Sequence, residues 1–571
     1  MVALELTSEI GNPIAPALFG GNYLFTRDHV GDEGTFDELT TALGVENIRY
    51  PGGSITERLF DISNPDRHIA YDLQNGTNVE VTPLSDFLSF AEHEGHSVTI
   101  VLPTRTYLSE QEDVNGDRFM EFDELELSRF VIDVASGVYG NVRVDAFEIG
   151  NEYWGSGEMS SVEYGRVSSR MVEVLDEALS SVSNVDFPTN EIDIIVQSGT
   201  NFRYSQLDDQ YSGISDPDEV LQALVEDYGL DPEGDFKFSS GSLNWTAINN
   251  EFIMREFDTL SEIDGLDGVA THVYSRQPEI PGTRDFFLKE IDSSWLEKFP
   301  DLETYVTEWN LKSGVEALGS DEYGLKQAHE MLNIVEAFSD HDVDAAHVWP
   351  LSQNTDNALS RGTEFDDLSP PGEMFRLMAE ELPGTRPLDL IGSEGKETEI
   401  SVSDIDVHAF ANPGKFVMYL SSTSDQLTST SIDLKNLLSE EDAAYVTYLG
   451  VEEGDHPGGI RSGAYIEEPS AREVQQEIFV DGMLQVDLDA HEIMQVVISS
   501  PTWSEDMDVY WANVASSDSG IGDDPIIPDT GPPVEDPAEP DEVSIDQSED
   551  ASDFSGLLFA LLPLLAIMGF A

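Results

Sequence analysis

The first 386 residues alternate short apolar runs with longer segments of helical spacing. Segments such as 161–179 and 325–339 repeat apolar residues every three or four positions, as amphipathic helices do. The expected strands are 17–21, 47–50, 97–104, 144–152, 192–198, 268–274, 304–308 and 345–351. Eight alternating units of strand and helix predict an α/β protein, in which a parallel sheet closes into a (β/α)8 TIM barrel over residues 15–386.

After Pro387 the pattern changes to short runs with period-two alternation, separated by Gly, Asn and Pro. Strands are expected at 399–411, 415–422, 443–451, 477–488 and 491–499. Such a succession without long helical spacing predicts a C-terminal β-sandwich over residues 387–502. No helix follows the N-terminal run within residues 1–14, so this run is expected to add a strand to the sandwich.

Residues 503–555 are dominated by Asp, Glu, Pro, Gly and Ser, which predicts a disordered acidic linker. The linker leads to an apolar segment, 556–571, which is shorter than the ~20 residues of a membrane-spanning helix. This segment fits a short tail anchor or a secretion or sorting signal, and any membrane contact is expected only through it. The N-terminus lacks the basic head of a secretory signal. Because the apolar segment could serve as an anchor or as a signal, we expect an extracellular or cell-surface protein.

The charge of the chain excludes some classes of partner. Of its 571 residues, 27 are Lys or Arg and 113 are Asp or Glu, which gives a net charge of −86. A protein with so few cations cannot displace the counterions of nucleic acid, and an anionic membrane surface would repel it. There are no cysteines, so disulfides and thiolate metal sites are excluded.

The same surplus of carboxylates predicts a halophilic protein. Repulsion between them disfavours the compact state at low ionic strength, and salt screens that repulsion. We expect the melting temperature and the activity to rise between low and marine-level NaCl. Equal melting temperatures at the two salt concentrations would contradict this prediction.

Two expected strands stop at a glutamate that is flanked by an amide and an indole. Glu152 lies in the run Phe-Glu-Ile-Gly-Asn-Glu-Tyr-Trp, and Glu308 lies in Tyr-Val-Thr-Glu-Trp-Asn. A single glutamate at a strand end is about as often the first solvated residue of a loop as it is a functional residue. Two of them, on strands four and seven of a barrel whose strand ends share one face, are what cleavage of a glycosidic bond requires.

These two motifs, together with Arg49-Tyr50-Pro51-Gly52-Gly53, resemble the clan A glycoside hydrolases over about residues 10–385. The closest similarity is to the branch of the family 51 arabinofuranosidases, the family 39 xylosidases and iduronidases, and the family 79 heparanase-like glucuronidases. The resemblance implies a retaining glycosidase with Glu152 as acid/base and Glu308 as nucleophile. Their carboxyl groups would lie ~5 to 5.5 Å apart.

The resemblance also implies how the two acids are held. Arg49 would lie against Glu308 and keep it charged, and Asn151 would donate to the 2-hydroxyl of the sugar. Glu152 has no cation in its own motif. Its pKa is therefore expected to be raised by burial and by the negative charge across the cleft.

The resemblance implies several other site residues, and for each of them a structural role is the alternative. His272 and Tyr274 alternate along expected strand six, and either could contact the nucleophile or serve the structure alone. Trp349 would stack on a sugar or belong to the core. Trp154 and Trp309 follow site residues directly and could pack behind them.

Four arginines fall at or just after expected strand ends: Arg49, Arg105, Arg276 and Arg361. Arginine binds carboxylates and sulfates through two parallel hydrogen bonds. The substrate is therefore expected to be an acidic or sulfated poly- or oligosaccharide, such as an algal glycan or a uronic-acid polymer. Salt bridges to the abundant carboxylates are the alternative.

One segment has the spacing of a calcium loop. Asp113, Asn115, Asp117, Glu121 and Glu124 occupy ligand positions, but Arg118 stands where such a loop has glycine. A solvated acidic loop is the alternative. No other cofactor is expected, and no His-rich cluster indicates zinc.

The function expected from the sequence is retaining hydrolysis of an extracellular polysaccharide. The alternatives are a carbohydrate-binding or adhesive surface protein on a glycosidase scaffold, and a structural component of an acidic matrix. A binder has no need for two glutamates that converge on one pocket.

Overall fold

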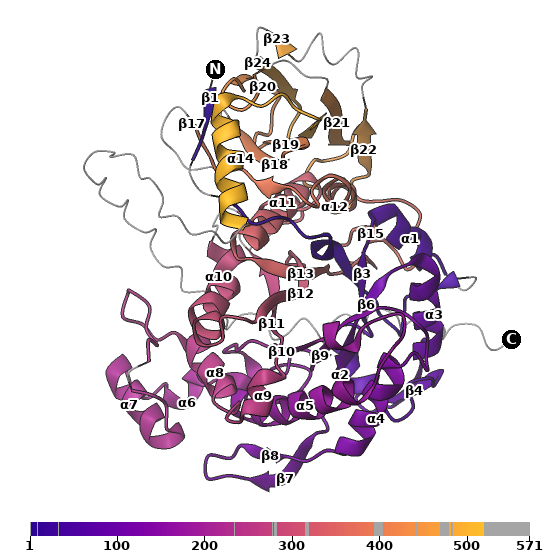
Figure 1. The fold of residues 1–571 in the computed structure, drawn as a ribbon, viewed down its shortest axis with the longest axis vertical. Helices are drawn as coiled ribbons and strands as arrows, with labels where there is room; N and C mark the ends of the chain where they lie inside the picture. Colours follow the sequence, from indigo (N-terminus) through magenta and orange to yellow (C-terminus); the bar gives the residue numbers. More distant parts are fainter. Residues whose placement is uncertain are drawn as a thin grey trace, which may run out of the picture.

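The fold consists of a barrel and a β-domain, which lies above it in Figure 1. The computed structural model describes residues 2–7, 10–31, 34–232, 234–276, 278, 282–314, 319–392, 404–439, 444–468, 479–480 and 483–518. The predicted apolar segment 556–571 and most of the predicted acidic linker lie outside these residues. Within the described ranges, no helix is both long and apolar enough to cross a membrane.

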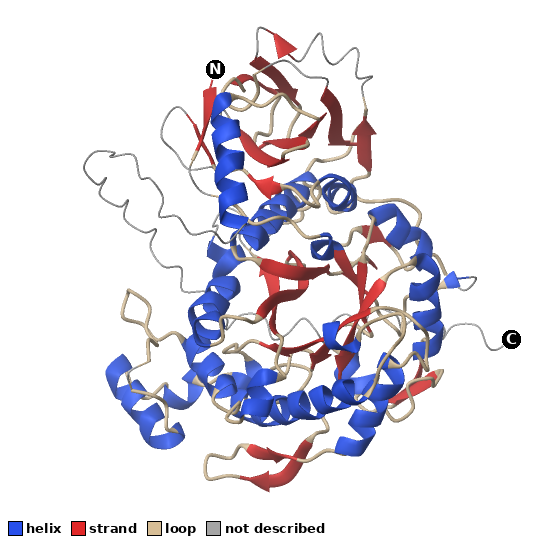
Figure 2. Cartoon of the chain, viewed as in Figure 1, coloured by secondary structure: helices blue, strands red, loops and turns tan. Residues whose placement is uncertain are grey.

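Eight parallel strands close the barrel in the order β10-β11-β12-β13-β2-β3-β6-β9, and helices surround them (Figure 2). In chain order the strands are β2 (Gly20–Asn22), β3 (Asn47–Tyr50), β6 (Ser97–Leu102), β9 (Val144–Ile149), β10 (Asp193–Gln197), β11 (Gly268–Ser275), β12 (Glu303–Leu311) and β13 (Val343–Val348). The predicted (β/α)8 barrel is confirmed, and each of the eight predicted runs overlaps one of these strands.

The first predicted strand, 17–21, is wrong in most of its length. Pro16–Phe19 form a 3-10 helix, η1, and β2 begins only at Gly20. Proline favours the first turn of a helix because its φ is preset and its missing N–H is not needed there. A Cβ on Gly20 would lie 2.7 Å from the Ala346 carbonyl oxygen, so glycine allows β2 to pack closely against β13.

The helices fill the segments between strands. They are α1 (Phe36–Leu43), α2 (Ile55–Leu59), α3 (Leu84–Glu94), α4 (Glu124–Ala135), α5 (Ser161–Ser181), η3 (Thr189–Glu191), η4 (Arg203–Ser205), α6 (Asp208–Tyr211), α7 (Pro217–Tyr228), α8 (Trp245–Met254), α9 (Leu260–Asp264), α10 (Gly282–Glu290), η5 (Ile291–Leu296), α11 (Leu325–Asp340) and α12 (Pro370–Glu381). The helical spacings at 161–179 and 325–339 correspond to α5 and α11. A capping box between Ser160 and Glu163 begins α5.

Short two-stranded sheets extend three of the loops. They are β4 (Ile69–Asp72) with β5 (Thr77–Glu80), β7 (Leu108–Glu112) with β8 (Arg118–Met120), and β14 (Ser352–Gln353) with β15 (Ser360–Arg361). The first two pairs are antiparallel and the third is parallel.

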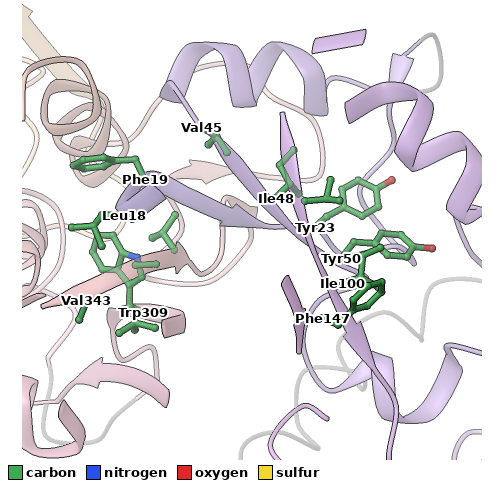
Figure 3. Packing of buried hydrophobic residues seen from close by; sticks show 14 of the residues in the cluster. Leu18, Phe19, Tyr23, Val45, Ile48, Tyr50, Ile100, Phe147, Trp309 and Val343 are labelled. Carbon is green, nitrogen blue, oxygen red and sulfur yellow. The ribbon is translucent and has the colours of Figure 1, made fainter. Parts of the chain in front are cut away.

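The barrel core has apolar layers on both sides of the strands. Outside, Tyr50 and Phe147 belong to the large cluster beneath the helices (Figure 3). Inside, Ala146, Ile195 and Tyr305 belong to a small separate cluster from β9, β10 and β12.

Carboxylates gather at the amino ends of the barrel strands. Asp193 on β10 accepts a hydrogen bond from the Tyr305 hydroxyl, and burial together with the nearby charges of Glu303, Asp267 and Asp145 raises its pKa to about 7. Burial also raises the pKa of Asp267 and of Asp344 to about 6. Burial in the folded barrel favours the protonated form of each of these carboxyl groups. Loss of their protons as the pH rises to neutral therefore destabilises the barrel.

Replacement of Asp193 by asparagine should therefore stabilise the protein at pH 8. A carboxyl whose pKa is raised from 3.8 to about 7 in the folded state adds stability at low pH that is lost as the pH rises through 7. After a discount for its partial exposure, we expect Asp193→Asn to raise the free energy of unfolding by about 1 to 2 kcal/mol at pH 8, and to change little at pH 4. Thermal melts of both proteins across this range, with the exposed Glu92→Gln as control, test it. A lower melting temperature for Asp193→Asn at pH 8 would contradict the prediction.

The β-domain has two sheets that face each other across a second core. The first has the order β17 (Leu390–Gly392), β1 (Val2–Leu6), β20 (Thr428–Asp433), β24 (Met483–Leu488) and β23 (Phe479–Val480). The second has the order β16 (Arg386–Pro387), β18 (Ile405–Asn412), β19 (Lys415–Ser422), β25 (Ile493–Ser499), β21 (Ala444–Val451) and β22 (Ala464–Glu467). The N-terminal strand β1 lies inside the first sheet, antiparallel to β17 and parallel to β20. Strands β16, β17, β20 and β22 were not expected from the sequence.

A final helix corrects the predicted start of the acidic linker. Residues predicted to be disordered from 503 onward form α14 (Glu505–Asp518), which runs along the β-domain (Figure 1). Met507, Tyr510 and Val514 recur at helical spacing and are buried in the second core. The acidic residues of the first turn stabilise the helix because they interact with the positive end of its dipole. A composition typical of a linker therefore conceals an amphipathic helix.

Candidate active site

Glu152 and Glu308 come together above the barrel. Glu308 lies on β12, and Glu152 follows β9 after a turn in which Gly150 has φ +78° and Glu152 itself has φ +44°. The left-handed conformation is unfavourable for a glutamate and is typical of functional positions. One carboxylate oxygen from each glutamate and one ring nitrogen of His272 all lie within 4.8 Å of one another.

The two expected strand-six residues have different contacts. The Tyr274 hydroxyl donates a hydrogen bond of 2.8 Å to Glu308 Oε2. His272 Nδ1 lies 3.5 Å from Glu152 Oε1 and 3.6 Å from Glu308 Oε2. Tyr274 therefore contacts Glu308 directly, and His272 lies between both carboxylates at distances typical of a charge contact.

Arg49 is fully buried and holds Glu308 from below. Its Nη1 donates to Glu308 Oε1 at 3.2 Å, and its Nη2 donates to Asn151 Oδ1 at 2.8 Å. Its Nε and Nη2 also bind the two oxygens of Glu148 at 2.5 and 3.1 Å. Burial alone would lower the pKa of Arg49, but the charges of Glu148 and Glu308 outweigh it and raise that pKa.

Glu148 is a site residue that sequence reasoning missed. It is fully buried one residue before the end of β9, and besides Arg49 it accepts hydrogen bonds from Thr307 Oγ1 at 3.0 Å and Gln197 Nε2 at 3.1 Å. An acidic residue in the centre of an apolar run was the available signal, because a buried charge needs partners.

Asn151 and the loops around it are braced by Glu57 on α2. Glu57 accepts the backbone N–H groups of Asn151, Thr104 and Arg105, each at 2.8 Å. The Asn151 side chain is itself fully buried, and its Nδ2 donates to Ser156 Oγ at 3.3 Å. Donation from Asn151 to a sugar hydroxyl, as the resemblance implied, stays a prediction.

The expected rise in the pKa of Glu152 is wrong. Burial would raise this pKa, but the neighbouring His272, Lys312 and Arg203 outweigh it and hold the pKa below its ordinary value. Burial would likewise lower the pKa of His272, but the charges of Glu308 and Glu152 raise it.

A cavity of about 460 Å³ is lined by Glu152, His272 and Tyr274, and Tyr274 is hydrogen-bonded to Glu308. Its lining includes Trp154, Phe202, Tyr204, Tyr274 and Phe287, which give it aromatic walls. Trp154 also contacts the His272 ring edge-on at 6.1 Å. Trp309 instead packs behind the site, buried against Phe338 and Phe375.

Positive charge is concentrated in this lining. It includes Arg58, Arg105, Arg203, Arg276 and Lys312 against two carboxylates, those of Glu152 and Glu158. Arg58 pairs with Asp72, and Arg105 pairs with Glu158. In a chain of net charge −86, this is a local reversal of sign.

Sequence reasoning named only two of these five cations, Arg105 and Arg276. Arg203 lies in the long connection between β10 and β11, where its φ is +47° and its guanidinium lies 5.5 Å from the Phe202 ring. Lys312 directly follows β12 and lies 4.7 Å from the Tyr274 ring. A lysine just after the strand that carries Glu308 was a usable signal, whereas nothing marked Arg203.

Arg49, Asn151 and Glu308 lie beneath the cavity lining, and two further predicted residues, Trp349 and Arg361, also lie outside it. Trp349 follows β13 and is half-buried, and its indole covers Gly53, where an added Cβ would lie 3.1 Å from the ring. Arg361 lies on β15, where burial and the nearby Arg461 lower its pKa. Stacking of Trp349 on a sugar stays a prediction.

The expected calcium loop forms the β7–β8 hairpin, and its acidic groups have protein partners. Asp113 accepts from Arg166 at 2.5 Å, and Asp117 accepts from Ser160 at 2.6 Å. Arg118, at the position where a calcium loop has glycine, donates to Glu163 at 2.6 Å. These contacts favour the alternative of an acidic loop, and calcium binding remains a prediction.

Comparison with known proteins identifies the fold. No family model matches the sequence. No curated protein matches it either. Among solved structures, the GH51 arabinofuranosidase from Xanthomonas axonopodis pv. citri is 15% identical with a TM-score of 0.55, over 87% of this chain and 99% of that chain. A family 51 α-L-arabinofuranosidase from Bifidobacterium longum is 13% identical with a TM-score of 0.56, over 87% and 99% of the two chains.

The α-L-arabinofuranosidase from Thermotoga maritima, solved with arabinose, is also similar, with 13% identity and a TM-score of 0.55 over 87% of this chain and 100% of that chain. The chain therefore has the fold of the clan A glycoside hydrolases, a TIM barrel followed by a β-domain. At such identities the likeness concerns the fold.

Proposed function

We propose that this protein is a retaining glycoside hydrolase. The observation that carries the proposal is the convergence of Glu152 and Glu308 within 4.8 Å at the carboxyl end of a TIM barrel. Retaining enzymes hold their two carboxyl groups about 5 to 5.5 Å apart, and inverting enzymes hold them farther apart to admit a water molecule. The similar fold of family 51 arabinofuranosidases and of a bifunctional glucanase-xylanase supports a carbohydrate substrate.

In the first step, Glu308 attacks the anomeric carbon while the bond from that carbon to the leaving oxygen breaks. Glu152 gives its proton to the leaving oxygen. Arg49 and Tyr274 each hold one oxygen of Glu308 and so orient it for attack. In the second step, Glu152 takes a proton from water, and the water oxygen displaces Glu308 with net retention.

His272 links the two acids electrostatically. The charges of Glu308 and Glu152 raise the pKa of His272, and His272 lowers the pKa of Glu152, whereas Glu152 must carry a proton to act as an acid. We infer that the entering sugar expels water and makes the charged pair costly, which moves the proton from His272 to Glu152. The net charge of the site is unchanged by this transfer.

We further propose that the substrate is an acidic or sulfated polysaccharide outside the cell. The support is the cluster of five cations in the cavity lining of an otherwise acidic protein. Arginine forks match carboxylate and sulfate oxygens, and their field would draw an anionic chain past the acidic surface.

The function is tested with a panel of aryl glycosides and of acidic and neutral polysaccharides. Hydrolysis with retained configuration at the anomeric carbon, followed by NMR, is expected for at least one substrate. Glu308→Gln keeps the shape of the side chain and should lose at least about 10³-fold in rate. Hydrolysis by Glu308→Gln equal to that of the wild type would refute the proposal, and binding without turnover of any substrate would favour a carbohydrate-binding protein.

The substrate class is tested with Arg105→Ala and Arg276→Ala. Each should raise KM for charged substrates about tenfold, equivalent to about 1.4 kcal/mol, and leave neutral aryl glycosides almost unchanged. Arg361→Ala is the matched control, because Arg361 also follows a barrel strand but lies outside the cavity lining. Equal effects on charged and neutral substrates would contradict the predicted preference.

A further inference from the structure

We propose that Glu152, His272 and Glu308 form a binding site for a divalent transition-metal ion, with Zn²⁺ as the best fit. The site is open to the cavity, and a bound ion would occupy the space between the two carboxylates. The inference concerns metal binding and does not require that the chain is a glycosidase.

The first support is geometric. In a tetrahedral zinc site with bonds of about 2.1 Å, neighbouring ligand atoms lie about 3.4 Å apart. His272 Nδ1 lies 3.5 Å from Glu152 Oε1 and 3.6 Å from Glu308 Oε2. These two distances match the edges of such a tetrahedron, and an oxygen of each glutamate lies within 4.8 Å of the other.

The second support is His272 itself. Its side chain is only 5% exposed, it lines the cavity, and neither ring nitrogen has a hydrogen-bond partner among the described residues. A buried polar group without a partner is costly. A metal ion bound to Nδ1 would replace its charge contacts of 3.5 and 3.6 Å with the two carboxylates by direct bonds.

Ligand type selects the ion. Buried Glu148 adds a third carboxylate beneath the site, and Arg49, Lys312 and Arg203 oppose the negative charge of the carboxylates, so the selection follows from the ligand atoms and not from the net charge. Arg49 uses Glu308 Oε1, which leaves Oε2 directed towards His272 and Tyr274. One imidazole with carboxylates favours Zn²⁺, Cu²⁺ or Ni²⁺, whereas Ca²⁺ and Mg²⁺ prefer oxygen ligands alone.

The test is calorimetric titration of the full chain with ZnCl₂ in the absence of substrate. Excess Mg²⁺ is included to occupy the many surface carboxylates. We expect one site per chain with a Kd on the order of micromolar. His272→Ala and Glu308→Gln should each weaken binding at least about tenfold, with circular dichroism to check that both variants fold.

His93→Ala is the matched control, because the His93 side chain is 86% exposed and belongs to no such group of potential ligands among the described residues. It should bind Zn²⁺ as the wild type does. Unchanged binding by both His272→Ala and Glu308→Gln, or binding that excess Mg²⁺ abolishes, would overturn the proposal and assign the ion to the surface. No binding at all would overturn it as well.

Inhibition separates this proposal from the proposed function. If the chain hydrolyses glycosides at this site, Zn²⁺ should raise KM and leave kcat unchanged. Zinc binding that depends on His272 but has no effect on hydrolysis would leave the metal site standing and place the hydrolytic site elsewhere.

Discussion

Replacement of Glu152 by alanine should lower the rate of polysaccharide hydrolysis by roughly 10²- to 10⁴-fold, the usual contribution of a general acid. An aryl glycoside with a very acidic phenol as leaving group needs no such proton. Its first step should therefore remain almost as fast as in the wild type. The second step still needs Glu152 as a base, so the sugar should accumulate on Glu308.

A burst of phenol equal to the enzyme concentration, followed by slow turnover, is the expected observation. Peptide mapping should find the sugar on Glu308. Azide, a nucleophile that needs no base, should restore turnover and give a glycosyl azide of retained configuration. Glu158→Ala removes the other carboxylate of the cavity lining and is the control, for which azide should have no effect.

The outcome that contradicts this role is equal loss on activated and natural substrates, with no burst and no rescue by azide. The same variant also reports on His272. Removal of Glu152 takes away one of the two carboxylates that raise the pKa of His272. An NMR titration should therefore find that pKa lower in Glu152→Ala than in the wild type.

The barrel could be predicted because its strands have a local signature. Each is a short apolar run buried on both faces, and helical spacing separates them. Glu152 and Glu308 followed from the same signature, since the carboxyl ends of all barrel strands lie on one face. The sequence signal for both was an acidic residue that interrupts an apolar run.

The electrostatics of the site could not be predicted from a local sequence pattern. The pKa of Glu152 depends on His272, Lys312 and Arg203, which lie on β11, after β12 and in the connection after β10. Their approach to Glu152 is a property of the closed barrel and of one long loop. The motif around Glu152 contains no cation, and reasoning from that motif alone gave the wrong direction.

Composition was misleading in the last part of the chain. Residues 505–518 share the acidic character of the linker that follows, yet four apolar or aromatic residues recur along one side of α14. A count over the whole tail averages this periodicity away. A window of about four helical turns would have detected it.

Replacement of Arg49 by methionine is expected to have the largest effect on stability. Arg49 lies between Glu148 and Glu308 and binds both. Without it, Glu148 remains fully buried with only the neutral donors Thr307 and Gln197. Removal of one partner from a buried ion pair costs about 3 to 5 kcal/mol, because the other charge stays uncompensated.

The double variant Arg49→Met/Glu148→Gln tests this explanation. It removes the stranded charge as well as the cation, so much of the lost stability should return, and a thermal melt of the single and double variants measures the recovery. Activity should not return, because Glu308 still lacks the guanidinium that holds Oε1. Recovery of both stability and activity would mean that Arg49 serves the fold alone. A double variant no more stable than Arg49→Met would mean that the cost arises from lost packing around Arg49, and that the charge of Glu148 is tolerated within the barrel.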